Sequence, residues 1–263
     1  MVLGILGHPV AHSLSPAMQE AALAARGLTG SYRLLDTPPE ALARRLEEVR
    51  RGYRGVNVTV PLKEAVLPLL DGVHPEARAI GAVNTVVNRG GRLIGHNTDA
   101  PGFLRSLEEA GVRGRRALVL GAGGAARAVA YALKGAGWEV GVHNRTRSRA
   151  EALARAFGLE VVPLEAARQA DLVVNATSVG LDDPAATPLP AALFPPRGFA
   201  VDLVYRPLLT RFLAEAAAAG LGTVDGLGML LWQGALAFEL WTGERAPVGA
   251  MRAALRRALG AGA

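Results

Sequence analysis

The sequence predicts an α/β fold of two α/β domains, and two observations support this prediction. Short apolar runs alternate with helical stretches along the chain, which is typical of strands connected by helices. A glycine-rich segment, GAGGAA at residues 121–126, closes one apolar run and opens a helical one. Because half of the 263 residues are hydrophobic and only 20% are charged, an intrinsically disordered chain is excluded.

The first half of the chain alternates short strands with helices. Strands are expected at residues 2–7, 32–35, 56–60, 82–88 and 92–94. Helices are expected at residues 16–26, 39–51, 62–70 and 100–110. The last two strands flank Arg89-Gly90-Gly91, which is a hairpin signal.

The second half alternates more regularly. Strands are expected at residues 116–120, 139–143, 160–162, 172–175 and 198–203, and helices at residues 124–135, 148–157, 164–170 and 208–219. The proline-rich segment 181–197 predicts an irregular loop. The last two helices, 228–241 and 247–259, precede no strand, so we expect them to pack on the first half. This predicts a discontinuous substrate domain, residues 1–100 plus 231–263, and a dinucleotide-binding domain, residues 101–230.

Composition excludes several classes of protein. The chain has no cysteine, which excludes disulfides, thiolate metal sites and cysteine nucleophiles, and its five histidines lack metal-binding spacing. No run of 18 apolar residues occurs and the first residues are not basic, which predicts a cytoplasmic protein without a membrane partner. The net charge is +6, but the arginines are scattered without interleaved aromatic residues, so we expect no nucleic-acid partner.

The glycine-rich segment matches the GxGxxA pattern of a Rossmann-type dinucleotide site. Gly121 allows a tight turn, Gly123 lets the backbone approach a pyrophosphate, and Ala126 allows close packing of the helix on the strand. The start of the helix adds unpaired N–H groups and the positive end of its dipole. The pattern therefore predicts a bound dinucleotide.

NADP(H) is the expected dinucleotide. NAD sites usually place Asp or Glu about 20 residues further on, where it binds the ribose 2′-hydroxyl. Here the segment HNRTRSR at residues 143–149 holds no acid and three arginines. Arginines bind a 2′-phosphate through charge-assisted hydrogen bonds. The alternative interpretation is an exposed basic loop that begins a helix.

Polar residues in the first half suggest how a substrate is held. Ser13 and Ser15 precede a helix whose first turn has no carboxylate, which suits a small carboxylate ligand; simple capping by Ser15 before Pro16 is the alternative. Thr59 and Lys63 follow a strand, and Lys63 is expected at the start of a helix. The helix dipole lowers the pKa of a lysine there, which suits a proton donor or acceptor. Asp99 is able to pair with Lys63; a surface lysine is the alternative.

Taken together, these segments resemble the shikimate dehydrogenases from residue 4 to about residue 243. Nine motifs in order carry the resemblance: GHPVAHSLSP (7–16), NVTVPLK (57–63), GAVNTV (81–86), GHNTDAPGF (95–103), GAGGAA (121–126), NRTRSR (144–149), NATSVG (175–180), DLVYRPLLT (202–210) and GLGMLLWQGALAFELWTG (226–243). The resemblance implies two α/β domains with the active site in the cleft between them.

The resemblance also implies a role for each matching residue. Lys63 is implied to be the general acid/base, with Asp99 as its hydrogen-bonded partner. The implied substrate-binding residues are Ser13 and Ser15 for the carboxylate, Thr59, Asn84, Asp99 and Gln233 for the ring hydroxyls, and Tyr205 for the carboxylate end. The implied cofactor-binding residues are Gly121, Ala122, Gly123, Gly124 and Ala125 for the pyrophosphate, Asn144, Arg145, Thr146 and Arg149 for the 2′-phosphate, and Leu203 and Gly226 along the nicotinamide. For Gln233, a structural glutamine bonded to backbone is the alternative.

The implied activity is the reversible NADPH-dependent reduction of 3-dehydroshikimate to shikimate in aromatic amino-acid biosynthesis. It needs a small-molecule substrate and no metal, and a homodimer is common among such enzymes. Two alternatives stay open, namely a broader quinate/shikimate dehydrogenase and a non-catalytic NADPH-binding regulatory module. The presence of both Lys63 and Asp99 argues against the regulatory module.

Overall fold

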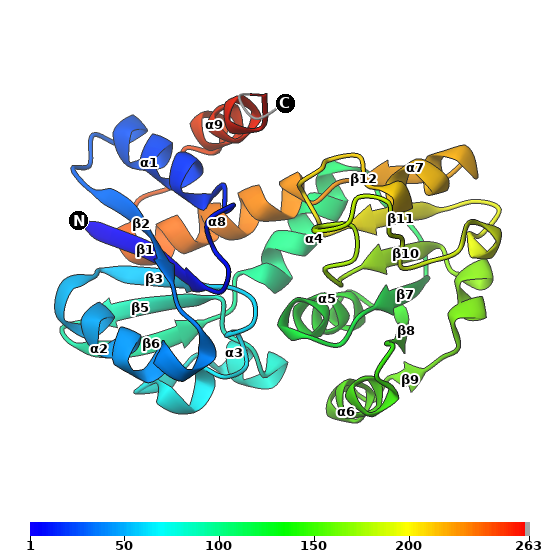
Figure 1. Cartoon of the computed structure of the whole chain (residues 1–263), viewed down its shortest axis with the longest axis horizontal. Coiled ribbons are helices and arrows are strands. Elements are labelled where there is room, and N and C mark those ends of the chain that lie inside the picture. Colours follow the sequence, from blue (N-terminus) through cyan, green and yellow to red (C-terminus); the bar gives the residue numbers. More distant parts are fainter. Residues whose placement is uncertain (261–263) are drawn as a thin grey trace. The chain divides into compact units, whose positions relative to one another are not determined.

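Two six-stranded sheets, each with its own helices, make up the computed structural model, which describes residues 1–260 (Figure 1). Contacts divide the chain into unit 1, which is Met1–Gly102 together with the chain from Leu231 onward, and unit 2, which is Phe103–Leu230. The predicted α/β class is confirmed. The boundaries that the sequence suggests, after residues 100 and 230, lie within two residues of this division.

Unit 1 is a mixed sheet with the strand order β2-β1-β3-β5-β6-β4. Its strands are β1 (Val2–Gly7), β2 (Ser31–Asp36), β3 (Gly55–Val58), β4 (Gly72–Val73), β5 (Thr85–Arg89) and β6 (Arg92–His96). β1 is parallel to β3, whereas β5 is antiparallel to both β3 and β6. The carboxyl ends of β1, β3 and β6 therefore meet the amino end of β5 at one edge. Four of the polar motifs begin or end at that edge.

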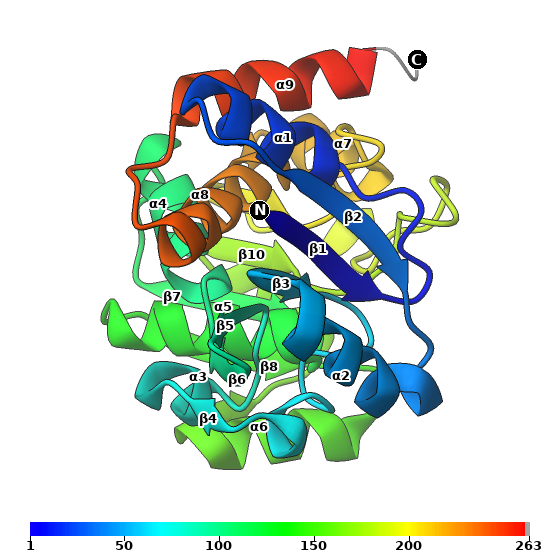
Figure 2. The same ribbon diagram turned by 90° about the vertical axis from the view of Figure 1, so that its left-hand side faces the viewer.

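Helices cover both faces of this sheet. They are α1 (Ser15–Ala25), α2 (Leu42–Gly52) after the 3-10 turn η1 (Pro39–Ala41), α3 (Pro75–Ile80), most of α8 (Leu227–Thr242), and α9 (Val248–Gly260). α1 and α9 contact each other and lie on the opposite side of the sheet from α2 (Figure 2). The last helices of the chain thus pack on elements of its first half.

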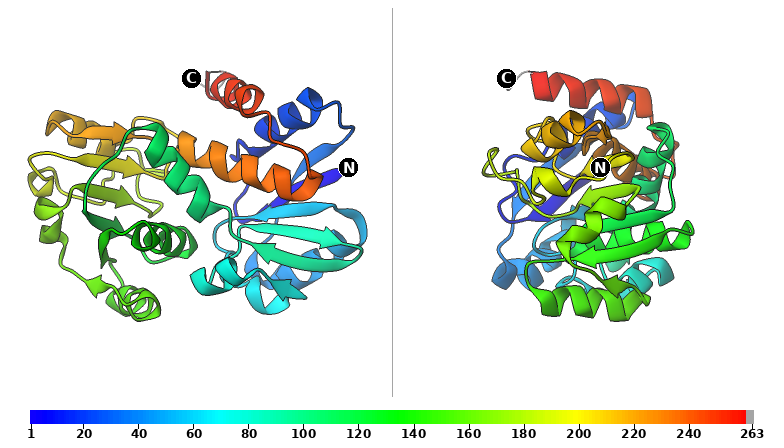
Figure 3. Two further views of the ribbon diagram at one scale, coloured as in Figure 1. Left: turned by 180° about the vertical axis from the view of Figure 1, so that it is seen from behind. Right: turned by 90° about the vertical axis from the view of Figure 1, so that its right-hand side faces the viewer.

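Unit 2 is a parallel sheet with the strand order β12-β11-β10-β7-β8-β9. Its strands are β7 (Arg116–Leu120), β8 (Glu139–His143), β9 (Glu160–Val161), β10 (Leu172–Asn175), β11 (Phe199–Asp202) and β12 (Gly222–Val224), and its helices are α4 (Asp99–Glu109, which starts in unit 1), α5 (Gly124–Gly135), α6 (Arg147–Phe157) and α7 (Arg211–Ala218). The order reverses between β7 and β10. α5 and α6 are neighbours and pack against β7, β8 and β9 (Figure 3). Open sheets of this kind bind ligands at the carboxyl edge beside such a reversal.

Three expectations about secondary structure were wrong or incomplete. The expected helix at residues 62–70 is a series of turns that ends in the 3-10 turn η2 (Leu67–Leu69), because Pro68 lacks the N–H that an α-helix would need. The expected helix at residues 164–170 is the 3-10 helix η3 (Leu164–Gln169), and η4 (Ala191–Leu193) interrupts the proline-rich loop. The short elements β4, α3 and β12 were not predicted.

Gly55 allows α8 to pack against the sheet of unit 1. A Cβ atom on Gly55 would lie 2.3 Å from Trp241 Nε1 and 2.5 Å from the Val86 carbonyl oxygen. The fully buried Trp241 donates a hydrogen bond from Nε1 to that same oxygen, at 3.0 Å. The indole therefore occupies the space that any other residue at position 55 would fill.

Asp202 is a fully buried carboxylate at the carboxyl end of β11 in unit 2. Its Oδ1 accepts hydrogen bonds from Asn175 Nδ2 and from the Val204 N–H, both at 2.9 Å, and its Oδ2 accepts one from Thr210 Oγ1 at 2.6 Å. Burial raises the pKa of Asp202 to about 6, although the three hydrogen bonds oppose this rise. The carboxylate joins the ends of two strands to the start of α7.

We expect Gly55→Ala to lower the free energy of unfolding by about 3 kcal/mol, because the new methyl group displaces Trp241 from its hydrogen bond. Urea denaturation followed by tryptophan fluorescence measures this change. Gly52→Ala is the control, because no atom lies within 4 Å of its added Cβ, and its stability should equal or slightly exceed that of the wild type. Equal stability of all three proteins would contradict the packing argument.

Stability should depend on pH through Asp202. Its pKa is raised in the folded state, so the folded protein keeps a proton that the unfolded chain releases between about pH 4 and pH 6. The free energy of unfolding of the wild type, relative to that of Asp202→Asn, should therefore fall as the pH rises through this range. The fall is about 3 kcal/mol at most, at about 1.4 kcal/mol per pH unit. Urea titrations of both proteins at several pH values measure it, and a difference that does not change with pH would refute it.

Candidate active site

Lys63 and Asp99 form a buried ion pair at the polar edge of unit 1. Lys63 Nζ donates a hydrogen bond to Asp99 Oδ2 at 2.6 Å. The Lys63 side chain is 12% exposed and the Asp99 side chain 4%. Lys63 lies in the turns that follow β3, and Asp99 is the first residue of α4. Because residues 62–70 form no α-helix, the dipole argument for a lowered Lys63 pKa does not apply.

Asn84 connects this pair to α8. Its Nδ2 donates to Asp99 Oδ1 and to Thr98 Oγ1, both at 2.9 Å, and lies 3.3 Å from Gln233 Oε1. Gln233 comes near because Gly102 has no side chain: a Cβ there would lie 2.7 Å from the Gln233 nitrogen. The structure thus brings Lys63, Asp99, Asn84 and Gln233 into one cluster. The role of Gln233 as a substrate-binding residue stays a prediction.

A second layer of buried polar residues holds Asn84 in place. Thr98 donates its N–H to Asn84 Oδ1 at 2.7 Å, and Asn57 Nδ2 donates to the Asn84 carbonyl oxygen at 3.1 Å. Asn57 Oδ1 in turn accepts a hydrogen bond from the Tyr32 hydroxyl at 2.7 Å. Thr98 and Tyr32 are supporting residues that the sequence reasoning missed. The signal for Thr98 was its place inside the GHNTDAPGF motif.

Ser13 and Ser15 lie beside the start of α1. Ser13 Oγ accepts a hydrogen bond from the Ser15 N–H at 3.2 Å, so the two residues are neighbours. Ser15 is the first residue of the helix and Leu14 is its N-cap, without a side-chain capping bond, so Ser15 does not cap the helix as the alternative interpretation held. Thr59, half-buried, follows β3, and its Cγ2 would lie 2.4 Å from a Cβ on Gly7. Thr59 therefore lies beside the end of β1.

The glycine-rich turn of unit 2 has the conformation that its sequence predicts. Gly121 has a φ of +118°, which strongly favours glycine, and a Cβ there would lie 2.9 Å from the Ala176 carbonyl oxygen. Gly123 is the N-cap of α5, and a Cβ there would meet no atom within 4 Å. Ala126 is fully buried and the first turn of α5 has no acidic residue. The space above Gly123 beside free helix N–H groups fits a pyrophosphate.

The three arginines that follow β8, one in the loop and two in the first turn of α6, differ in their contacts. Arg147 Nε donates to Glu151 Oε1 at 2.9 Å. In residues 1–260 no ion pair or side-chain hydrogen bond is found for Arg145 or Arg149, and both are exposed. Asn144 Nδ2 donates to the Thr146 carbonyl oxygen at 2.9 Å, which shapes the loop. Within the described part of the chain, Arg145 and Arg149 thus have free guanidinium groups, whereas Arg147 is engaged.

Leu203 and Gly226 lie against each other in unit 2. A Cβ on Gly226 would lie 2.5 Å from the Leu203 carbonyl oxygen and 2.9 Å from that of Val204. Tyr205 follows in the same loop and is half-buried. The two residues that the resemblance assigns to the nicotinamide are therefore spatial neighbours at the carboxyl edge of the sheet.

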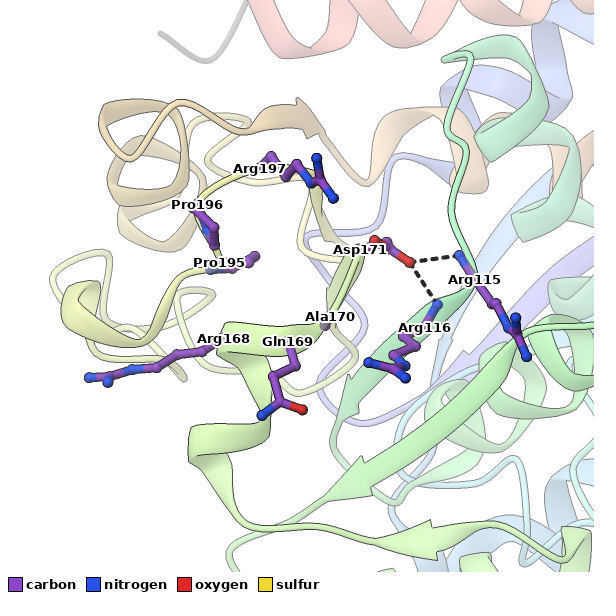
Figure 4. Close-up of a pocket in the computed structure, with 9 residues that line it drawn as sticks. All are labelled: Arg115, Arg116, Arg168, Gln169, Ala170, Asp171, Pro195, Pro196 and Arg197. Atoms are coloured by element: carbon purple, nitrogen blue, oxygen red, sulfur yellow. Dashed lines mark hydrogen bonds between the residues drawn. The ribbon is translucent and has the colours of Figure 1, made fainter.

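A cavity of about 510 Å³ lies at the other, amino edge of this sheet, before β7, β10 and β11 (Figure 4). Four arginines line it, namely Arg115, Arg116, Arg168 and Arg197. Asp171 accepts hydrogen bonds from the N–H groups of Arg115 and Arg116 at 2.8 and 2.9 Å, which lower the pKa of its carboxyl. The glycine-rich turn follows the carboxyl end of β7, so this cavity is not the predicted cofactor site.

Two searches of residues 1–260 complete the description of candidate sites. No three His, Asp or Glu side chains gather closely enough there to hold a metal ion. In the same residues, no helix is both long and apolar enough to cross a membrane.

Comparison with protein families matches three parts of the chain. Residues 5–86 match the shikimate dehydrogenase substrate binding domain, residues 105–181 match the shikimate/quinate 5-dehydrogenase family, and residues 226–256 match the shikimate 5′-dehydrogenase C-terminal domain. The first match contains Lys63 and Asn84, and the second contains the glycine-rich turn and the arginine loop.

Individual relatives agree over nearly the whole chain. A shikimate dehydrogenase (NADP(+)) of Thermus thermophilus is 65% identical over 97% of this chain and 98% of its own length. A crystal structure of shikimate 5-dehydrogenase from Thermus thermophilus, in complex with NADP(H) and shikimate, has a TM-score of 0.95 at 64% identity and covers 98% of this chain and all of that one. Quinate dehydrogenase from Corynebacterium glutamicum in complex with NAD is more distant, with 38% identity and a TM-score of 0.87 over 98% of this chain and 99% of that one. With the motifs, the fold and the buried pair in agreement, the chain belongs to the shikimate dehydrogenase family.

Proposed function

We propose that this chain catalyses the reversible NADPH-dependent reduction of 3-dehydroshikimate to shikimate, a step of aromatic amino-acid biosynthesis. The observation that carries the proposal is the Lys63–Asp99 pair, bonded to Asn84 beside Gln233, in a chain that is 65% identical to an enzyme named for this activity.

Lys63 acts as the general acid in the direction of reduction. One N–H of its Nζ donates to Asp99 Oδ2 at 2.6 Å. The other N–H groups of Nζ are available to a substrate oxygen. Donation of a proton from Nζ to the carbonyl oxygen, together with the hydride that NADPH would supply to the carbonyl carbon, yields the hydroxyl group. In oxidation Nζ takes the hydroxyl proton while NADP⁺ would take the hydride. Asp99 orients the ammonium group and accepts from a neighbouring hydroxyl.

The other polar residues of unit 1 orient the substrate. Asn84, Gln233 and Thr59 bind ring hydroxyls, while Ser13 and Ser15 bind the carboxylate beside the start of α1. Tyr205 of unit 2 contacts the carboxylate end. Because Asn84 is fixed by Thr98 and Asn57, its amide is held in one orientation before a substrate arrives.

The cofactor fits the carboxyl edge of unit 2. Residues 121–125 bind the pyrophosphate, Asn144, Arg145, Thr146 and Arg149 bind the 2′-phosphate, and Leu203 and Gly226 lie along the nicotinamide. NADPH, when bound, supplies the hydride. The free guanidinium groups of Arg145 and Arg149 and the open space above Gly123 support this assignment.

Turnover measured at 340 nm tests the proposed activity. Shikimate and quinate are each supplied with NADP⁺ or NAD⁺. Rapid turnover with shikimate and NADP⁺ alone is the expected result. Comparable rates with quinate or NAD⁺ would favour the broader quinate/shikimate dehydrogenase; the 38% identical relative is a quinate dehydrogenase in complex with NAD. Binding of NADPH without any turnover would favour the non-catalytic module.

We expect Lys63→Ala to lower kcat by about 10²- to 10⁴-fold, because the proton donor is lost, and to change the KM for shikimate by no more than a few-fold. Steady-state kinetics with NADP⁺ measures both. Lys134→Ala is the matched control, since Lys134 is the other lysine of the chain. It lies near the carboxyl end of α5 and donates a hydrogen bond to the Phe157 carbonyl oxygen. A near-normal kcat for Lys63→Ala would refute the assignment.

We expect Arg145→Ala and Arg149→Ala each to raise the KM for NADP⁺ by about 10-fold or more while leaving the KM for NAD⁺ nearly unchanged, because each removes charge-assisted hydrogen bonds to the 2′-phosphate. Arg147→Ala should change the KM for NADP⁺ by less than about 3-fold, because Arg147 pairs with Glu151. The ratio of the two KM values at constant ionic strength checks this. A larger effect for Arg147 than for the other two would overturn the assignment of the loop.

A further inference from the structure

We propose that Asp202 is a positioning residue for the nicotinamide half of the cofactor, because its buried carboxylate holds the backbone of residues 203–204 and the start of α7 at the carboxyl edge of unit 2. This inference rests on the proposed function. Asp202 itself has no exposed surface, so it acts through the segments that it holds.

Three segments converge on this one side chain. Asn175 ends β10, Val204 follows β11, and Thr210 is the N-cap of α7, whose Oγ1 also accepts the Leu213 N–H at 3.3 Å. All three donate to the Asp202 carboxylate at 2.6–2.9 Å. These elements are neighbours in Figure 1. A carboxylate accepts hydrogen bonds only, with room for about four, so it satisfies three donors at once.

The segment after β11 is held from two sides. Asp202 Oδ1 accepts the Val204 N–H, and the backbone of Gly226 lies directly against the Leu203 and Val204 carbonyl oxygens. Only a glycine allows this close approach, because a Cβ at position 226 would lie 2.5 Å from the Leu203 oxygen. The Leu203 N–H also donates to the Asn175 carbonyl oxygen at 3.0 Å. The position of Leu203 therefore depends on this backbone bond, on the Asp202 bond to Val204 and on Gly226 together.

The glycine-rich turn does not depend on Asp202 in the same way. Gly121 packs against the Ala176 carbonyl oxygen, and the Ala176 N–H donates to the Leu120 carbonyl oxygen at 2.9 Å. The Gly121 N–H donates to the His143 carbonyl oxygen at 2.8 Å. Backbone hydrogen bonds thus hold the pyrophosphate and adenosine side of the cradle. Loss of the Asp202 carboxylate should disturb the nicotinamide side selectively.

Asp202→Asn tests this while keeping the volume of the side chain. An amide donates where the carboxylate accepted, so at least one of the three donors loses its acceptor. The matched control is Asp171→Asn, the same change at the opposite edge of the same sheet, where Asp171 accepts two backbone N–H groups. Asp202→Ala, whose folding is checked by circular dichroism, removes all three acceptors.

Binding of NADPH and of adenosine 2′,5′-bisphosphate, which lacks the nicotinamide, is measured for each variant by calorimetry at pH 8. For Asp202→Asn we expect about 10-fold weaker NADPH binding, unchanged binding of the bisphosphate within 2-fold, a lower kcat, and an unchanged KM for shikimate. Asp171→Asn should match the wild type in all four. A folded Asp202→Asn with normal NADPH affinity, or with equal weakening of both ligands, would overturn the inference. Failure of the wild type to oxidise shikimate would instead refute the proposed function, and the comparison of the two ligands would still test the role of Asp202.

Discussion

The ion pair between Lys63 and Asp99 is the interaction on which the polar edge of unit 1 depends. Removing two charges from water costs several kcal/mol per ion, and this cost is recovered only when the geometry is good and the remaining polar atoms are bonded. Asp99 Oδ1 accepts a hydrogen bond from Asn84 Nδ2. The Asn84 side-chain and backbone oxygens are in turn bonded by the Thr98 N–H and by Asn57 Nδ2. The pair therefore explains why so many polar side chains are buried where β1, β3, β5 and β6 meet.

The need to bond the polar atoms around this pair also accounts for the packing of α8, from the end of the chain, on unit 1. Gln233 reaches Asn84 only because α8 approaches the start of α4 closely at Gly102 and the start of the chain closely at Gly234, where a Cβ would lie 2.1 Å from Met18 Cε. Trp241, packed on Gly55, holds the other end of α8. Glycines on three elements thus place one amide beside the ion pair, across 149 residues of sequence.

Local patterns predicted the elements that are long and periodic, such as β1, β7, α5 and α8. They failed at residues 62–70, where apolar spacing suggested a helix but Pro68 removes a donor, and they missed β4 and β12, which are too short to show a period. The site followed a similar rule. Lys63, Asp99 and the glycine-rich turn could be singled out because each stands in a recognisable motif, although the helix start expected at Lys63 is absent. Thr98, Tyr32 and Gly102 matter only through partners that the fold brings near. A sequence motif therefore identifies a candidate reacting residue more readily than it identifies the residues that hold that residue in place.

The two units use buried carboxylates in different ways. Asp99 faces an ammonium group whose side chain keeps 12% of its surface exposed, as the proposed proton transfer from Nζ to a substrate requires. Asp202 is fully buried, and within residues 1–260 its hydrogen-bond donors are an amide, a hydroxyl and a backbone N–H. A fully buried carboxylate of this kind does not touch a ligand, but it fixes the segments that donate to it. The buried carboxylate of unit 1 thus lies against a partly exposed cation, whereas that of unit 2 bonds only neutral donors among the described residues.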